Sequence, residues 1–216
     1  EGLQLLYKQQ VDSLVKAGAD LLIFETFANI KEAEAALSCS EKYDITKILM
    51  MQAHRYPLSR RQRIIKDFIA VGKKFNIDAI GINCAPPHAI TEYAETLSGL
   101  TDLPIMVNPN AGTPKVERGN VEYELPINTL IQEAEQWYDF GVSIFGGCCG
   151  TNPEHIKALA DNFKNRIPVE HKVQPADSSF IKSIEIPKKS IEKCIKDNPV
   201  RKIFSGNRKI VAVEMR

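Results

Sequence analysis

The chain has 216 residues, with 28 Lys and Arg against 27 Asp and Glu, a formal net charge of +1, and 44% hydrophobic residues. This balance is typical of a globular chain that buries a sizeable core, and it gives no electrostatic reason to expect nucleic acid or a membrane surface as a partner. The longest apolar runs, at 21–24 and 48–51, are far shorter than the roughly 20 residues that span a bilayer.

The five cysteines, at positions 39, 84, 148, 149 and 194, argue against a disulfide framework. Their number is odd. Cys148 and Cys149 are neighbours whose Cα atoms lie only about 3.8 Å apart, whereas a disulfide favours a separation of about 4.4 to 6.8 Å. Reduced thiols fit this pattern, which predicts a cytoplasmic protein.

Helix-type and strand-type patterns alternate over the first 165 residues. A helical stripe runs from Leu3 to Val15 and ends at Gly18, and the next apolar run predicts a strand over 20–25. Further strands are predicted over 47–53, 78–83, 104–108 and 142–146, and further helices over 30–42, 60–75, 89–98, 127–140 and from 151 onward. The spacing of the strand ends is close to one eighth of the roughly 250 residues of a (β/α)8 barrel, although an open doubly wound sheet has the same local pattern.

The composition changes near residue 168. Prolines and lysines become frequent over 168–202, which predicts a linker. The run 209–214, KIVAVE, then has the pattern of a new strand, and we expect it to stand alone with no strand to pair with. We therefore predict an α/β domain over 1–167, the linker over 168–202, and the first strand of a second domain within 203–216.

Three cysteines lie at the carboxyl ends of predicted strands: Cys84 in GINC, and Cys148 and Cys149 in GGCCG. In a barrel these ends share one face, where active sites are built, so the three thiols are predicted to meet in space. Three thiolates leave the fourth position of a tetrahedral zinc open, which is the arrangement of a catalytic site. A small buried hydrophobe is the alternative for Cys84 taken alone. Cys39 and Cys194 lack such surroundings and are interpreted as structural or incidental.

Two further polar positions follow predicted strands. Glu25 ends the run LLIFE, where an unpaired carboxylate is costly, so it either caps the next helix or binds a cation. Asn108, Asn110 and Gly112 in VNPNAGTP form a polar turn after a strand, and simple turn chemistry is the favoured interpretation on this pattern alone.

The runs LLIFETF, GINC, PNAGTP and GVSIFGGCCGTNPEHIKAL occur in this order over residues 1 to about 165. Together they resemble the homocysteine S-methyltransferase domain, a zinc-dependent (β/α)8 TIM barrel. The resemblance implies a truncated barrel in which strands four to eight are present and strands one to three lie outside the chain. The chain taken alone is accordingly expected to be inactive.

The resemblance also implies roles for individual residues. Cys84, Cys148 and Cys149 match the zinc ligands of the family. Glu25 matches the acidic residue that binds the amino group of homocysteine, and Asn110 matches an asparagine that contacts zinc or substrate.

Two hypotheses for the function follow. The first is transfer of a methyl group to the thiol of homocysteine to give methionine, with Zn²⁺ making the thiol a thiolate at neutral pH. The second is a zinc-binding or purely structural α/β fragment without turnover. The segment Met51–Ser59 departs from the family pattern, so any donor-site role of this loop stays open; His54 could line the pocket, but an ordinary loop histidine is the favoured interpretation. The methyl donor is not predicted, because the barrel segments expected to discriminate between donors lie outside the chain. The oligomeric state is not predicted either.

The last residues carry a second resemblance. The run FSGNRKIVAVEMR, at 204–216, resembles the opening strand of methylenetetrahydrofolate reductase as it occurs fused behind this methyltransferase domain in a bacterial bifunctional family. It implies that a reductase domain starts here, for which FAD is the expected cofactor. Glu214 matches the acidic residue of that reductase strand.

Overall fold

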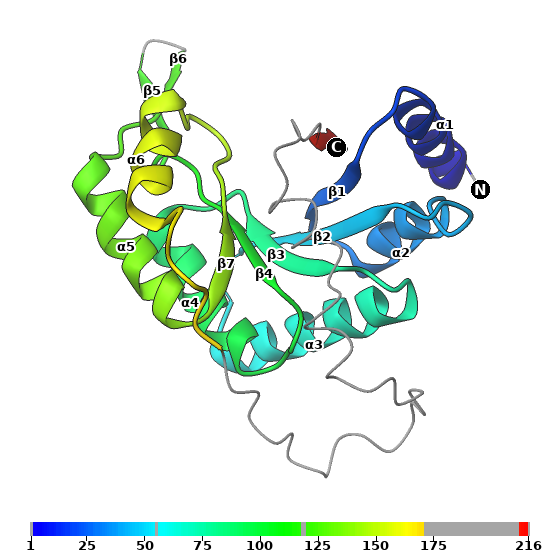
Figure 1. The fold of residues 1–216 in the computed structure, drawn as a ribbon, viewed down its shortest axis with the longest axis horizontal. Coiled ribbons are helices and arrows are strands. Elements are labelled where there is room, and N and C mark those ends of the chain that lie inside the picture. The colour runs from blue at the N-terminus through cyan, green and yellow to red at the C-terminus, as the bar shows by residue number, and fades with distance from the viewer. Residues whose placement is uncertain (1, 55, 118–119, 171–211, 216) are drawn as a thin grey trace.

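The computed structural model of the chain describes residues 2–54, 56–117, 120–170 and 212–215 (Figure 1). The helices in these residues are α1 (Gly2–Lys16), α2 (Ile30–Ser38), α3 (Leu58–Lys74), α4 (Pro87–Ser98), α5 (Ile127–Asp139) and α6 (Pro153–Phe163). The strands are β1 (Leu21–Phe27), β2 (Thr46–Gln52), β3 (Ala79–Asn83), β4 (Ile105–Asn108), β5 (Lys115–Glu117), β6 (Asn120–Glu122), β7 (Val142–Phe145) and β8 (Ala212–Met215). None of the helices described is long and apolar enough to cross a membrane.

Six strands form one parallel sheet in the order β7-β4-β3-β2-β1-β8 (Figure 1). From β1 to β4 and on to β7, each strand is followed by a helix and then by its neighbour in the sheet, which is the pattern of successive βαβ units. β5 and β6 form a separate antiparallel hairpin between β4 and α5. Because the sheet is parallel, the carboxyl ends of its strands lie along one edge, and this edge carries the candidate site.

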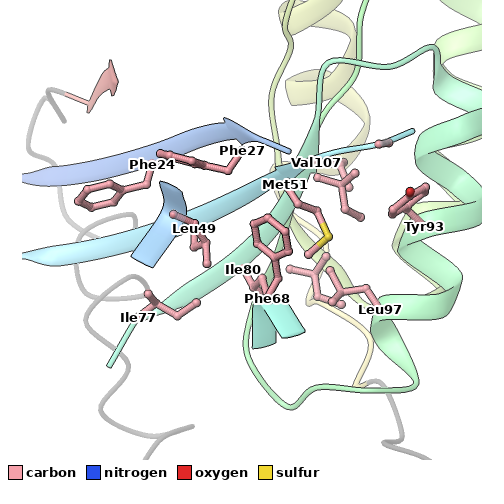
Figure 2. Packing of buried hydrophobic residues seen from close by; sticks show 14 of the residues in the cluster. Phe24, Phe27, Leu49, Met51, Phe68, Ile77, Ile80, Tyr93, Leu97 and Val107 are labelled. Atoms are coloured by element: carbon pink, nitrogen blue, oxygen red, sulfur yellow. The ribbon is translucent and has the colours of Figure 1, made fainter. Parts of the chain in front are cut away.

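Apolar side chains on the two faces of the sheet enter two separate clusters, as expected of a buried parallel sheet. The larger cluster joins the sheet to the helices, and Figure 2 shows part of it: Phe24, Leu49, Met51, Ile80 and Val107 from the strands, with Phe68, Tyr93 and Leu97 from the helices. The buried residues of the smaller cluster alternate with these along the strands: Leu21, Ile48, Met50, Ala79 and Met106. The helices therefore pack on one face, and the opposite face is called the inner face below.

The predicted alternation of helices and strands is confirmed, with most ends shifted by only one or two residues. The second helix was expected to reach residue 42 but ends at Ser38. There Cys39 and Ser40 donate backbone hydrogen bonds to carbonyls three residues earlier, which tightens the last turn. The hairpin of β5 and β6 was not predicted, because each of its strands has only three residues and all of them are exposed.

The expectation of an unpaired strand near the end of the chain is wrong. β8 lies parallel to β1, with Leu21 opposite Ala212 and Phe24 opposite Met215. Without this partner, β1 would present a row of free backbone N–H and C=O groups at the edge of the sheet, and such groups bind a further strand readily. The predicted linker over 168–202 lies mostly outside the described residues.

Trp137 offers a test of the packing between α5 and its neighbours. Its side chain is completely buried, and its indole Nε1 donates a hydrogen bond of 2.7 Å to Thr91 Oγ1 on α4. We expect Trp137→Ala to lower the free energy of unfolding by about 3 to 5 kcal/mol, because it leaves a large cavity. Urea unfolding followed by circular dichroism measures this loss. Val116→Ala on the hairpin is the control, since that side chain is 73% exposed and its loss should change stability by less than about 0.5 kcal/mol.

Candidate metal centre

Three cysteine sulfurs meet at the carboxyl edge of the sheet, as predicted. Cys84 follows β3 directly, and Cys148 and Cys149 follow β7 after two glycines. The three sulfur atoms lie within 4.8 Å of one another, and those of Cys148 and Cys149 are 3.8 Å apart. Each of the three residues is half-buried. In the part of the chain that the structure describes, no other group of three or more His, Cys, Asp or Glu side chains is placed to bind a metal ion.

The spacing and the chemistry of these sulfurs fit zinc. Two Zn–S bonds of about 2.3 Å at a tetrahedral angle separate their sulfurs by about 3.8 Å, and Cys148 and Cys149 have this separation. Burial, followed by the neighbouring Cys149 and Cys84, raises the pKa of the Cys148 thiol to about 12 in the metal-free protein. Three thiolates this close together repel one another, and a bound divalent cation offsets that repulsion.

Backbone hydrogen bonds position the two neighbouring cysteines against the turn that follows β4. The N–H of Cys148 donates to the carbonyl of Pro109 at 2.8 Å, and the N–H of Ala111 donates to the carbonyl of Cys149 at 2.8 Å. The side chain of Asn110 adds a third bond, because its Oδ1 accepts the N–H of Cys149 at 3.2 Å. These three bonds fix the position and orientation of both cysteines relative to residues 109–112, which we call the PNAG turn.

The glycines before the cysteine pair leave room for this contact. A methyl group added at Gly146 would lie 2.3 Å from Asn108 Oδ1, and one added at Gly147 would lie 2.2 Å from Thr151 Cγ2. Neither position has space for a side chain. Gly146 therefore allows β7 to lie close to Asn108 of β4, and Gly147 allows the loop after β7 to fold back on its own Thr151 around the cysteine pair.

Glu25 lies at an irregular point of β1, on the inner face of the sheet. The register between β1 and β2 shifts between Phe24 and Phe27, and Thr26 in this segment has a φ of 65°. Such a bulge redirects side chains next to functional sites. Glu25 itself is 7% exposed, so its carboxylate is almost entirely removed from bulk water.

Asn83, which the sequence analysis did not assign, connects Glu25 to the cysteine cluster. Its Nδ2 donates to Glu25 Oε2 at 3.1 Å and to Thr26 Oγ1 at 2.7 Å, while its Oδ1 accepts the N–H of Thr26 at 3.1 Å. Asn83 is completely buried and directly precedes Cys84. The alternation of side chains along 79–83 could have predicted that Asn83 lies on the inner face. It could not have predicted the hydrogen bonds to Glu25 and Thr26, because these residues are distant in sequence.

The other predicted residues are placed less centrally. His54 donates its backbone N–H to Tyr93 Oη and accepts from the same hydroxyl through its carbonyl, and these contacts position the loop after β2. Cys39 is buried directly after the last residue of α2, where its thiol lies 3.2 Å from the carbonyl oxygen of Ala35. Its structural interpretation agrees with this placement.

Fold and site together define an α/β protein with a three-thiol centre at the carboxyl edge of a parallel sheet. The sequence profile of the homocysteine S-methyltransferase family matches residues 1–163, and the chain belongs to this family.

Individual relatives agree with the family match. Homocysteine S-methyltransferase 1 of Brassica oleracea var. italica is 32% identical over 169 residues, which are 74% of this chain and 51% of that protein. The methionine synthase of Mycobacterium tuberculosis is 28% identical over 194 residues, which are 82% of this chain and 16% of that protein. The chain thus spans about half the length of the curated methyltransferases that it matches.

Solved structures of a homocysteine methyltransferase have a similar fold. The apo form of MmuM from Escherichia coli superposes with a TM-score of 0.60 at 29% identity, covering 74% of this chain and 56% of that one. The metallated form of the same enzyme gives a TM-score of 0.57 at 28% identity, covering 74% and 52%.

Replacing Asn83 tests the connection between Glu25 and the cysteine cluster. We expect Asn83→Ala to lower the free energy of unfolding by about 2 to 4 kcal/mol, because three hydrogen bonds are lost and a buried carboxylate loses a partner. Urea unfolding of the full-length protein measures the loss. Asn128→Ala, at an exposed position of α5, is the matched control. Equal stability of the two variants would show that Asn83 has no such role.

Proposed function

We propose that the protein transfers a methyl group to the thiol of homocysteine and forms methionine, in a zinc-dependent reaction. The observation that carries this proposal is the cluster of three cysteine sulfurs at tetrahedral spacing, formed by the residues that resemble the family's zinc ligands. Membership of the homocysteine S-methyltransferase family supports the reaction class. We also propose that the parallel sheet is part of a (β/α)8 barrel and contributes its strands four to eight.

The chemistry follows from the donor set. Cys84, Cys148 and Cys149 would hold the zinc ion, and a zinc ion bound there would lower the pKa of the substrate thiol so that it reacts as a thiolate. Three sulfur ligands give the site more negative charge than histidines would, which favours an electron-rich sulfur on the substrate. The homocysteine sulfur forms a bond to the methyl carbon. The bond between that carbon and the donor breaks, and its electron pair stays on the donor. The identity of that donor is open.

Glu25 and Asn110 are the proposed contacts for the rest of the amino acid substrate. The Glu25 carboxylate is buried and fixed by Asn83, so it offers an oriented negative charge to an ammonium group. Asn110 is buried as well, and its Oδ1 accepts the backbone N–H of Cys149, which supports its proposed role as a contact for zinc or substrate. Fixing both ends of homocysteine would align its sulfur for attack.

Two further proposals concern the intact protein. The resemblance of residues 204–216 supports a fusion to a methylenetetrahydrofolate reductase domain, with FAD as its cofactor. A cytoplasmic location is also proposed, on the odd number of cysteines and the adjacent pair Cys148 and Cys149 in the sequence.

Removing one sulfur tests the metal site. In the full-length protein, Cys148→Ala or Cys149→Ala should abolish stoichiometric zinc binding and methyl transfer together, because two sulfurs make a poor site. Metal analysis and an assay with each donor class measure both. Cys39→Ala is the control and should retain zinc and activity. Wild-type zinc content in Cys148→Ala would overturn the assignment.

The same samples separate the enzyme from a structural zinc module. X-ray absorption at the zinc edge should show three sulfur ligands in the wild-type protein and a fourth after homocysteine is added. A structural site would show a complete set of protein ligands and no change on addition.

Replacing the carboxylate tests the role of Glu25. Glu25→Gln keeps an oxygen acceptor for Asn83 but removes the charge, so zinc content should be unchanged. Loss of a charge-assisted contact should raise the dissociation constant of homocysteine by about tenfold to a hundredfold. Isothermal titration measures the constant, with Glu95→Gln at an exposed position of α4 as the control. An unchanged constant would leave Glu25 with a purely structural role.

A further inference from the structure

The loop after β2, residues 53–57, begins beside the cysteine cluster. The N–H of Ala53 donates a hydrogen bond of 3.2 Å to the carbonyl of Asn83, the residue directly before Cys84. The backbone of the next residue, His54, forms hydrogen bonds in both directions with a tyrosine hydroxyl on α4. The loop is therefore attached to the carboxyl edge of the sheet, next to the proposed metal ligands.

This loop and the start of α3 form a basic and aromatic surface. Four arginines and no acidic residue occur in the run 54–63, HRYPLSRRQR. The ring centroids of His54 and Tyr56 are 5.6 Å apart, and Arg60 Cζ lies 4.2 Å from the centroid of the Tyr56 ring. Arg60 is in the first turn of α3 and is exposed to solvent. The cation–π contact with Tyr56 therefore orients a planar guanidinium at the edge of the site.

The charge of this guanidinium is not neutralised by another described residue. Arg61 is buried against α4, where its Nη1 forms an ion pair of 2.5 Å with Glu92. Arg60 and Arg63, by contrast, form no ion pair within the part of the chain that the structure describes. A guanidinium that is oriented by an aromatic ring and has no carboxylate partner can accept the carboxylate of a ligand in two parallel N–H···O bonds.

We propose that Arg60 binds a carboxylate of the methyl donor, so that the donor of this protein is an anion and not a sulfonium cation. The inference rests on the proposed function, because it names the chemical class of the second substrate of that reaction. Arg63 follows Arg60 by three residues on α3 and adds to the positive potential there. A donor with a net positive charge would be repelled by the same side chains.

The burial of the groups at this edge favours the donor over homocysteine as the source of the carboxylate. The proposed contacts for homocysteine are Glu25, which is 7% exposed, and the half-buried cysteine cluster. An amino acid held by these groups occupies the inner part of the site, so the methyl donor must approach its sulfur from the solvent. Arg60 is exposed and follows a loop at the same edge of the sheet, which is where an entering donor would meet it.

Protection of Arg60 from chemical modification tests the inference on the wild-type full-length protein. Phenylglyoxal modifies exposed arginines, and mass spectrometry of the peptides gives the rate at each of them. 5-Methyltetrahydrofolate, which has an anionic glutamate tail, is the first probe. At ten times its half-saturating concentration it should slow modification of Arg60 about tenfold, because only about one site in ten is then empty. S-methylmethionine, a sulfonium with a net positive charge, and homocysteine alone should leave the rate unchanged. Arg166, which is paired with Glu135, is the internal control.

Replacing Arg60 tests the contact itself. Arg60→Gln should raise the half-saturating concentration of 5-methyltetrahydrofolate in the methyl-transfer assay by about tenfold to a hundredfold, as expected for the loss of one charge-assisted contact. The zinc content and the half-saturating concentration of homocysteine should stay the same. Lys66→Gln is the matched control, because it removes one exposed positive charge from the same helix and should change neither concentration.

The outcomes separate this inference from the proposed function. Equal modification of Arg60 with and without 5-methyltetrahydrofolate would overturn the inference even if the glutamine variant folded poorly, and so would methyl transfer from S-methylmethionine alone. A higher half-saturating concentration of homocysteine in Arg60→Gln would also overturn it, because the bound carboxylate would then belong to the amino acid. The proposed function stands in each case as long as homocysteine is methylated. Absence of methyl transfer from every donor would instead refute the proposed function.

Discussion

The whole site depends on the backbone contact between the turn after β4 and the segment after β7. Hydrogen bonds of 2.8 Å run in both directions across it, from Cys148 to Pro109 and from Ala111 to Cys149. Gly146 leaves room for this approach, because a side chain at that position would meet Asn108 of β4. Parallel pairing of β3 with β4 then brings Cys84 to the same place. The sulfur cluster is thus a product of strand order and backbone packing, and the thiols are brought together although ionised thiolates would repel one another.

That arrangement brings two kinds of functional group to the carboxyl ends of the strands. The sulfurs lie at the ends of β3 and β7, and the buried carboxylate of Glu25 lies at the end of β1. Asn83 joins the two regions, because it bonds Glu25 and Thr26 with its side chain and continues into Cys84 along the backbone. A ligand with a soft sulfur at one end and a cationic group at the other matches this separation of charges and donor types.

Much of this could be predicted from the sequence, for identifiable reasons. Apolar periodicity located the helices and strands, and the position of Cys84, Cys148 and Cys149 after strands predicted that they meet. Asn83 was missed because its partners, Glu25 and Thr26, are set by tertiary contacts between strands distant in sequence. The pairing of β8 with β1 was missed for a related reason: an edge strand accepts a partner through its backbone, which leaves no trace in side-chain pattern.

Cys84 has a left-handed backbone conformation, with a φ of 58°. The residue type that would be most stable in this conformation is therefore not the one that supplies a sulfur. Glycine adopts this conformation without cost, whereas another residue is strained there by about 1 to 2 kcal/mol. A glycine would suit the turn after β3 better and would remove the sulfur. Random mutation combined with selection for thermal stability alone would therefore tend to replace this cysteine, and a screen for stabilised variants needs an accompanying selection for the proposed metal binding to retain it.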